Sequence, residues 1–151
     1  MGKTIAAALS KGNERVLLVD KNFEVAETVS ANLLTANKQY DVEAVSCSHD
    51  AAWEADIIIL AVACSELEVV ANYIKDVSTQ KIIIAVSDSF KEDTAAASET
   101  LLQLLPNCKI ARVIKINNKG MECILKNKDE DAAGTLHELF GIINSGTSNA
   151  D

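Results

Sequence analysis

Polar side chains follow four apolar runs of the chain, and their types and positions could do chemistry. They are Asp20-Lys21-Asn22 after the run 16–19, residues 61–65 at the end of the run 57–62, and the groups 87–89 and 115–118. In open α/β sheets, ligands bind at the carboxyl ends of the strands. Polar residues after a strand also form turns and cap helices, so a single group leaves both interpretations open. Four groups at one rim favour a ligand site.

Asp20 and Lys21 bear on which ligand such a rim would take. An acidic side chain at the end of the second strand of a dinucleotide-binding fold accepts a hydrogen bond from the ribose 2′-hydroxyl of NAD. A basic side chain beside it instead attracts the 2′-phosphate of NADP. The pair therefore leaves NAD and NADP both open. Asp20 could alternatively cap the helix that is expected to begin near Phe23.

Residue types that mark other chemistries are few or wrongly spaced. His49 and His137 are the two histidines, and neither has ligand partners at the spacing of a metal motif, so we expect no metal site. The sequence contains no Gly-x-Ser-x-Gly turn, no Walker loop and no Cys–His signature. Cys64 lies where an expected strand meets an expected helix, a place where a thiol pKa can fall, although core packing is its favoured role. No catalytic acid or base can be named.

Apolar, β-branched runs alternate with helical patterns along the chain. Continuous apolar runs at 16–19, 57–62, 82–86 and 110–114 are typical of strands buried on both faces of a parallel sheet. The weaker runs 41–45 and 121–125 suit sheet edges. Helical spacing predicts helices between these runs and at both ends of the chain, with Ser65 and Glu68 as the capping box of one of them. The alternation predicts an α/β fold, a three-layer sandwich with a mostly parallel sheet.

Composition restricts the partners and the compartment. The chain has 151 residues, of which 22 are acidic and 14 basic, for a net charge of −8. Such a balance disfavours nucleic acid and anionic membrane surfaces, and the longest apolar run, 57–64, is too short to span a bilayer. The four cysteines match no zinc or redox spacing, which favours free thiols in the cytoplasm. We expect one domain over residues 1–144 and a flexible polar tail over 145–151.

Three stretches of sequence together resemble a known family. They are Met1–Leu9 followed by Glu14–Asn22, then Ala55–Val62, and finally Leu101–Lys109. In combination they resemble the N-terminal Rossmann domain of deazaflavin-dependent (coenzyme F-420) NADP reductases, relatives of the pyrroline-carboxylate reductases and the STEAP reductase domains. The resemblance implies an NAD(P)-binding domain of an oxidoreductase that transfers hydride, with NADP or NAD as its cofactor.

The resemblance also implies roles for particular residues. Gly2 would be the third glycine of the family's Gly-x-Gly-x-Met-Gly fingerprint and would let the helix pack on the sheet. Lys21 stands where an arginine often reads the 2′-phosphate, and residues 61–63 would pass beneath the cofactor. The expected cofactor-binding residues are Gly2, Asp20, Lys21, Asn22, Ala61, Val62 and Ala63.

The family's first strand and first two fingerprint glycines have no counterpart in this sequence. We therefore expect a Rossmann-like domain truncated at its start, with cofactor binding weak or absent, because those glycines bring backbone amides to the pyrophosphate. Removing strand 1 from the order 3-2-1-4-5-6 leaves, after renumbering, the flavodoxin-like order 2-1-3-4-5. The runs 16–19 and 57–62 would then pair directly. If they stay apart, we expect a homodimer that fills the gap.

A second resemblance leaves a different function open. The residues Val16–Asn22 resemble the start of a response-regulator receiver, 56–60 resembles its third strand, and Lys115 falls near its last-strand lysine. The phosphoacceptor position holds Ala61, and a magnesium-bound phosphoryl site needs carboxylates that are missing here. The opening helix also has no place in a receiver. The alternative is therefore a non-enzymatic, receiver-like or flavodoxin-like binding or interaction module.

Overall fold

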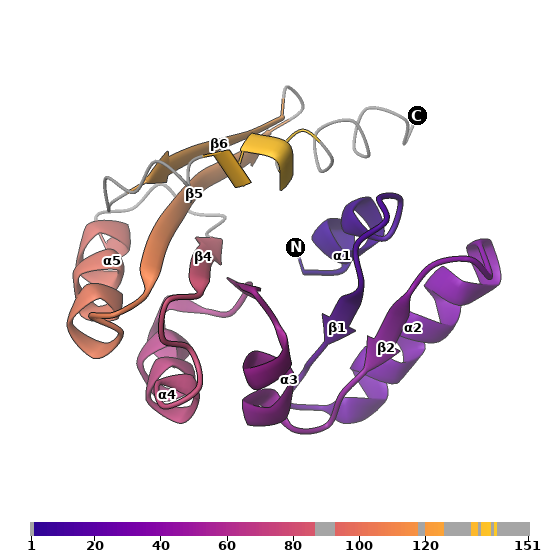
Figure 1. Cartoon of the computed structure of the whole chain (residues 1–151), viewed down its shortest axis with the longest axis horizontal. Coiled ribbons are helices and arrows are strands. Elements are labelled where there is room, and N and C mark those ends of the chain that lie inside the picture. Colours follow the sequence, from indigo (N-terminus) through magenta and orange to yellow (C-terminus); the bar gives the residue numbers. More distant parts are fainter. Residues whose placement is uncertain are drawn as a thin grey trace.

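Helices and strands alternate along the chain, as the sequence predicts (Figure 1). The computed structural model describes residues 2–86, 93–117, 120–125, 134, 135, 137–139 and 141. The helices are α1 (Gly2–Leu9), α2 (Phe23–Ala36), α3 (Ser48–Glu54), α4 (Cys64–Ile74) and α5 (Asp93–Leu104). The strands are β1 (Val16–Leu18), β2 (Val42–Ala44), β3 (Ile57–Leu60), β4 (Ile82–Val86), β5 (Lys109–Asn117) and β6 (Gly120–Leu125). Of the expected last helix, residues 134, 135, 137–139 and 141 are helical, and the tail 145–151 lies outside the described residues.

The strands form two sheets rather than one. β1 pairs in parallel with β2. The second sheet has the order β3-β4-β5-β6, in which β6 alone is antiparallel to its neighbour. Among the described strands, none joins the two sheets. The expected direct pairing of 16–19 with 57–62, and with it the continuous order 2-1-3-4-5, is therefore wrong. The homodimer expected for this case stays a prediction.

Burial along the strands follows from this break. β4 has neighbours on both sides, and four of its five residues are buried. β3 lies at the edge of its sheet, and its three isoleucines are only partly buried. Val19, expected in a buried strand, follows β1 and is 42% exposed. A continuous apolar run indicates which faces of a strand are covered, but it does not indicate whether a neighbouring strand lies beside it.

Two apolar clusters on opposite faces of the strands make the three layers. One cluster joins α1 to both sheets, because Ile5 and Leu9 pack with Val16 of β1 and with Ile82 and Ile84 of β4. The other places α3, α4 and α5 on the opposite face, around the fully buried Ile83, Ile110, Leu101 and Ala71. Apolar packing on α1, and not a backbone ladder, therefore couples the two sheets on the first face.

Polar groups fix the ends of the helices. The side chain of Asn22 caps α2 by accepting a hydrogen bond from the Glu24 amide. Lys81, which is distant in sequence, caps the C-terminal end of α3. Its Nζ donates to the carbonyl oxygens of Ala52 at 2.7 Å and Ala55 at 2.6 Å. A cation at a helix C-terminus also interacts favourably with the helix dipole. The expected cap of α4 is wrong, because the helix starts earlier, at Cys64, with Ala63 as its N-cap and no side-chain cap bond. No helix in the described parts of the chain is long and apolar enough to cross a membrane.

Candidate functional site

The start of α1 lies against the end of β3. A Cβ atom added to Gly2 would lie 3.5 Å from the Cβ of Ala61, the residue that follows β3. This is ordinary van der Waals contact, so the first turn of α1 lies close to the Ala61 side chain at this point. The turn and the residues 61–63 thus share one place at the carboxyl end of β3. Of these residues, Ala61 and Ala63 are exposed and Val62 is partly buried against the α3–α4–α5 cluster.

Asp20 and Asn22 both stabilise the turn between β1 and α2. The Oδ1 atom of Asp20 accepts a hydrogen bond from the backbone N–H of Asn22 at 2.9 Å. The Oδ1 atom of Asn22 accepts one from the N–H of Glu24 at 3.2 Å. The expectation that Asp20 could cap this helix is therefore wrong, because Asn22 is the cap and Asp20 forms a local turn before it. These bonds hold the loop at the end of β1 in a defined shape.

Lys21 reaches from this loop to the first turn of α4. Its Nζ donates to Oε1 of Glu66 at 2.8 Å, and the two side chains are 83% and 43% exposed. The hydrogen bond that Lys21 donates to Glu66, followed by the negative charge of Glu66, raises the pKa of Lys21. The same hydrogen bond lowers the pKa of the Glu66 carboxyl below its ordinary value. Both groups are therefore charged at neutral pH, and the pair connects the loop after β1 with the helix after β3.

The first turn of α1 differs electrostatically from those of the neighbouring helices. α2, α3 and α4 carry Glu24, Asp50 and Glu66 there, whereas α1 carries no acidic residue and has Lys3 instead. The first four N–H groups of a helix have no partner within it, and they form its positive end. The donor set at the start of α1 therefore fits a phosphate group. The sequence did not single out Lys3.

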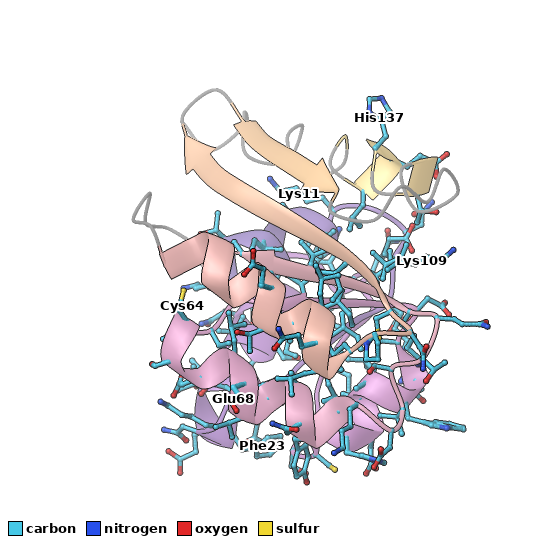
Figure 2. All side chains as sticks on the ribbon, turned by 90° about the vertical axis from the view of Figure 1, so that its left-hand side faces the viewer. Lys11, Phe23, Cys64, Glu68, Lys109 and His137 are labelled. Carbon is cyan, nitrogen blue, oxygen red and sulfur yellow. The ribbon has the colours of Figure 1, made fainter. Side chains whose placement is uncertain are left out.

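Several expected rim residues are not placed. Residues 87–89, at the end of β4, and Asn118 lie outside the described residues, as do the side chains of 115–117. Cys64, expected in the core, is exposed at the start of α4 (Figure 2), so that expectation is wrong. α4 starts two residues earlier than its sequence pattern indicates, so that Cys64 is the exposed first residue of the helix.

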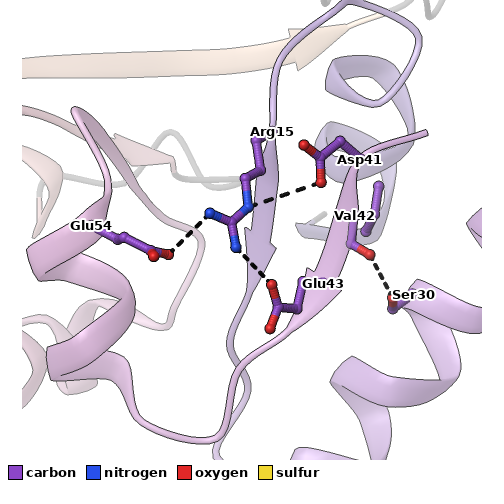
Figure 3. A network of polar contacts seen from close by, with 6 residues as sticks. All are labelled: Arg15, Ser30, Asp41, Val42, Glu43 and Glu54. Atoms are coloured by element: carbon purple, nitrogen blue, oxygen red, sulfur yellow. Dashed lines mark hydrogen bonds and ion pairs between the residues drawn. The ribbon is translucent and has the colours of Figure 1, made fainter. Parts of the chain in front are cut away.

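Arg15 forms a polar network that the sequence analysis did not identify (Figure 3). Its guanidinium lies 2.7 Å from a carboxylate oxygen of Glu43, 3.4 Å from one of Glu54 and 3.9 Å from one of Asp41. The hydrogen bond to Glu43 and the charge of Glu54 raise the pKa of Arg15. The alternation of Asp41 and Glu43 on one face of a strand was the signal available in the sequence. The network ties β1, β2 and α3 together.

A hollow of about 370 Å³ lies beside this network, away from the rim. Arg15, Glu43, His49, Trp53 and Glu54 are among its lining residues, and none of the expected cofactor-binding residues is. The volume is within the ordinary range for ligand pockets. Arg15 is already engaged by carboxylates, and the lining is mainly α3 and β2, so the hollow is a feature of the packing of α3. The rim, where Gly2, Lys21 and residues 61–63 lie, remains the candidate site.

The chain is similar to known proteins in sequence and in fold. The family model described as "NADP oxidoreductase coenzyme F420-dependent" matches residues 1–89. A pyrroline-5-carboxylate reductase from Coxiella burnetii is 14% identical with a TM-score of 0.73, over 95% of this chain and 53% of that one. The pyrroline carboxylate reductase of Plasmodium falciparum, solved with NADP bound, is 16% identical with a TM-score of 0.59, over 87% and 56% of the two chains. A conserved hypothetical protein from Sinorhizobium meliloti 1021 is 17% identical with a TM-score of 0.63, over 91% and 48%.

No curated protein matches the chain. The chain spans about half the length of these solved structures, and identities this low show the fold alone. The fold and the rim together define the class, an α/β domain of Rossmann-like type. The family match covers more than half of the 151 residues. The chain belongs to the coenzyme F420-dependent NADP oxidoreductase family, which confirms the family indicated by the sequence.

Proposed function

We propose that the chain is the NADP-binding domain of an oxidoreductase and that NADP lies across the rim formed by α1, the loop after β1 and the residues after β3. The observation that carries the proposal is the close approach of Gly2 to Ala61, which puts the acid-free start of α1 at the carboxyl end of β3. Ligands of open α/β sheets bind at this end. The family match and a neighbour solved with NADP bound support the choice of cofactor.

Each group of residues has a definite task in this proposal. The N–H groups at the start of α1, together with Lys3, hold the pyrophosphate, because they carry the positive end of the helix dipole. Lys21 attracts the 2′-phosphate on the adenine side, which favours NADP over NAD. The small side chains of Ala61 and Ala63 leave the floor of the site open. The nicotinamide ring supplies the hydride chemistry when it is bound, and the described residues position it.

Titration of the whole chain with NADP⁺ and NAD⁺ tests this proposal. Amide NMR shifts are expected to move at residues 2–5, 20–22 and 61–65 as NADP⁺ is added up to millimolar concentration. Replacing Lys21 by Gln is expected to weaken NADP⁺ binding by roughly two- to fivefold, because an exposed ion pair contributes modestly, while NAD⁺ binding stays nearly unchanged.

Lys75→Gln is the matched control. It removes the same charge from the other end of α4, where Lys75 is the C-cap residue, and it is expected to leave both affinities unchanged. Equal losses of NADP⁺ affinity in Lys21→Gln and Lys75→Gln would show that NADP⁺ binding depends only on the net charge of the protein. Shifts that cluster around Arg15 and Trp53 instead of the rim would place the ligand in the hollow and contradict the proposal.

A further inference from the structure

The ion pair between Lys21 and Glu66 crosses the break between the two sheets. Lys21 follows β1 and Glu66 lies in the first turn after β3, and these two strands belong to different sheets. The Nζ to Oε1 distance of 2.8 Å makes the pair a direct, charged hydrogen bond. A ligand that lies over the carboxyl ends of β1 and β3 must therefore meet this pair.

We propose that Glu66 is a specificity-determining residue that competes with the 2′-phosphate of the nucleotide for Lys21 and so reduces the preference for NADP over NAD. This inference rests on the proposed function. Its basis is that the carboxylate already occupies the amine that the phosphate would use. The Glu66 carboxylate would also repel a phosphate bound to Lys21. Two anionic groups that share one amine lie closer together than the Debye length of about 8 Å at physiological salt, so the solvent screens this repulsion only in part. The neutral 2′-hydroxyl of NAD meets no such repulsion.

The competition depends on the charge of Glu66 and not on its bulk. Both members of the pair are exposed, so the carboxylate can turn away without loss of core packing. The hydrogen bond from Lys21 lowers the pKa of Glu66, so the carboxylate stays ionised at neutral pH and the competition operates there. Glu68, two residues further along α4 and therefore on a different face of the helix, has the same charge and carries no ion pair with Lys21 (Figure 2).

The test is a comparison of dissociation constants for NADP⁺ and NAD⁺ in the full chain and in Glu66→Gln, Glu66→Asp and Glu68→Gln. Glu66→Gln is expected to raise the affinity ratio of NADP⁺ to NAD⁺ by about two- to fivefold, the range for an exposed ion pair. Glu66→Asp, which keeps the charge, is expected to remain close to the wild type, as is Glu68→Gln. The effect of Glu66→Gln is expected to shrink in 0.5 M salt, since salt screens exposed charges.

The outcomes separate this inference from the proposed function. Binding of NADP⁺ with an unchanged ratio in Glu66→Gln overturns the inference and leaves the proposed function standing. An equal rise in Glu66→Gln and Glu68→Gln also overturns it, because the effect would then be one of net charge. If neither the wild type nor Glu66→Gln binds NADP⁺ or NAD⁺, the proposed function and this inference are both overturned.

Discussion

At the scale of single residues, the loop after β1 shows how far sequence reasoning reaches. Asp20, Lys21 and Asn22 were identified because they follow an apolar run, and the structure places them in a turn at the end of β1. The partner of Lys21 was not identified. Glu66 is 45 residues away, and no local pattern indicates which of many acidic side chains will lie opposite a given lysine.

Cys108 gives a prediction about pH at the same scale. Its Sγ lies 2.9 Å from the carbonyl oxygen of Ser78, and burial raises the pKa of the thiol above its ordinary value of 9.0. The protonated thiol is thus favoured in the folded state. Its contribution to stability is complete below the pKa of the unfolded thiol and is lost as the pH rises through the folded pKa. We expect the free energy of unfolding to fall as the pH is raised above about 9.

Chemical denaturation at pH values from 7 to 10.5 measures this dependence. Cys108→Ala is the control, and its stability is expected to fall less steeply over the alkaline range because the variant has no buried thiol to ionise. Parallel curves for the two proteins would contradict the prediction. Alkylation gives a second readout, since exposed Cys64 is expected to react rapidly and buried Cys108 only after unfolding.

At the scale of elements, the existence and order of the strands could be predicted and their lateral neighbours could not. The runs 82–86 and 57–62 look alike in sequence, yet β4 has neighbours on both sides and β3 on one. The spacing of hydrophobic residues indicates which faces of a strand are buried. The pairing of edges depends on the rest of the fold, and for this reason the order 2-1-3-4-5 failed while the α/β class was confirmed.

Among the described strands only β4 pairs with β3, and the other edge of β3 predicts a pattern of amide exchange. The N–H of Ile82 donates to the carbonyl oxygen of Asp56, so the alternation of a parallel ladder turns the amides of Ile57 and Ile59 toward the side without a strand. We expect these two amides to exchange faster than those of Ile83 and Ile84 in β4. Hydrogen–deuterium exchange followed by NMR measures the four rates in one sample.

The amides of Ile58 and Leu60 serve as internal controls, because the same alternation turns them toward β4. Slow exchange at all four positions of β3 would mean that another chain or segment covers its free edge. An exposed strand edge is also a template for pairing with a second molecule. The homodimer expected from the sequence would therefore be detected by the same measurement at high protein concentration.

At the scale of the whole molecule, α1 is the helix that holds the two sheets together. Its residues Ile5, Ala8 and Leu9 are buried among side chains from both sheets. Truncating Ile5 and Leu9 to Ala should cost about 2–5 kcal/mol at each site, the usual range for a buried aliphatic side chain. Since this packing couples the sheets, we also expect the double variant to lose its two-state unfolding.

Two probes reveal such a loss of cooperativity. The fluorescence of Trp53, the single tryptophan, reports on α3, and far-ultraviolet circular dichroism reports on the molecule as a whole. Their denaturation curves are expected to coincide in the wild type and to separate in the double variant. Val69→Ala, at a position that is 70% exposed on α4, controls for loss of methyl groups alone. If the denaturation curves of the double variant and of Val69→Ala change by a similar small amount, α1 does not couple the sheets.

The replacement of a backbone ladder by side-chain packing between β1 and β3 has a mechanical consequence. Ladder hydrogen bonds fix the separation of two strands, whereas packed side chains permit small shear displacements of one layer over another. The mouth of the rim can thus widen or narrow as α1 slides, without breaking any strand pairing within either sheet. The exposed ion pair between Lys21 and Glu66 is then a direct polar link across this break, between the loop after β1 and the start of α4.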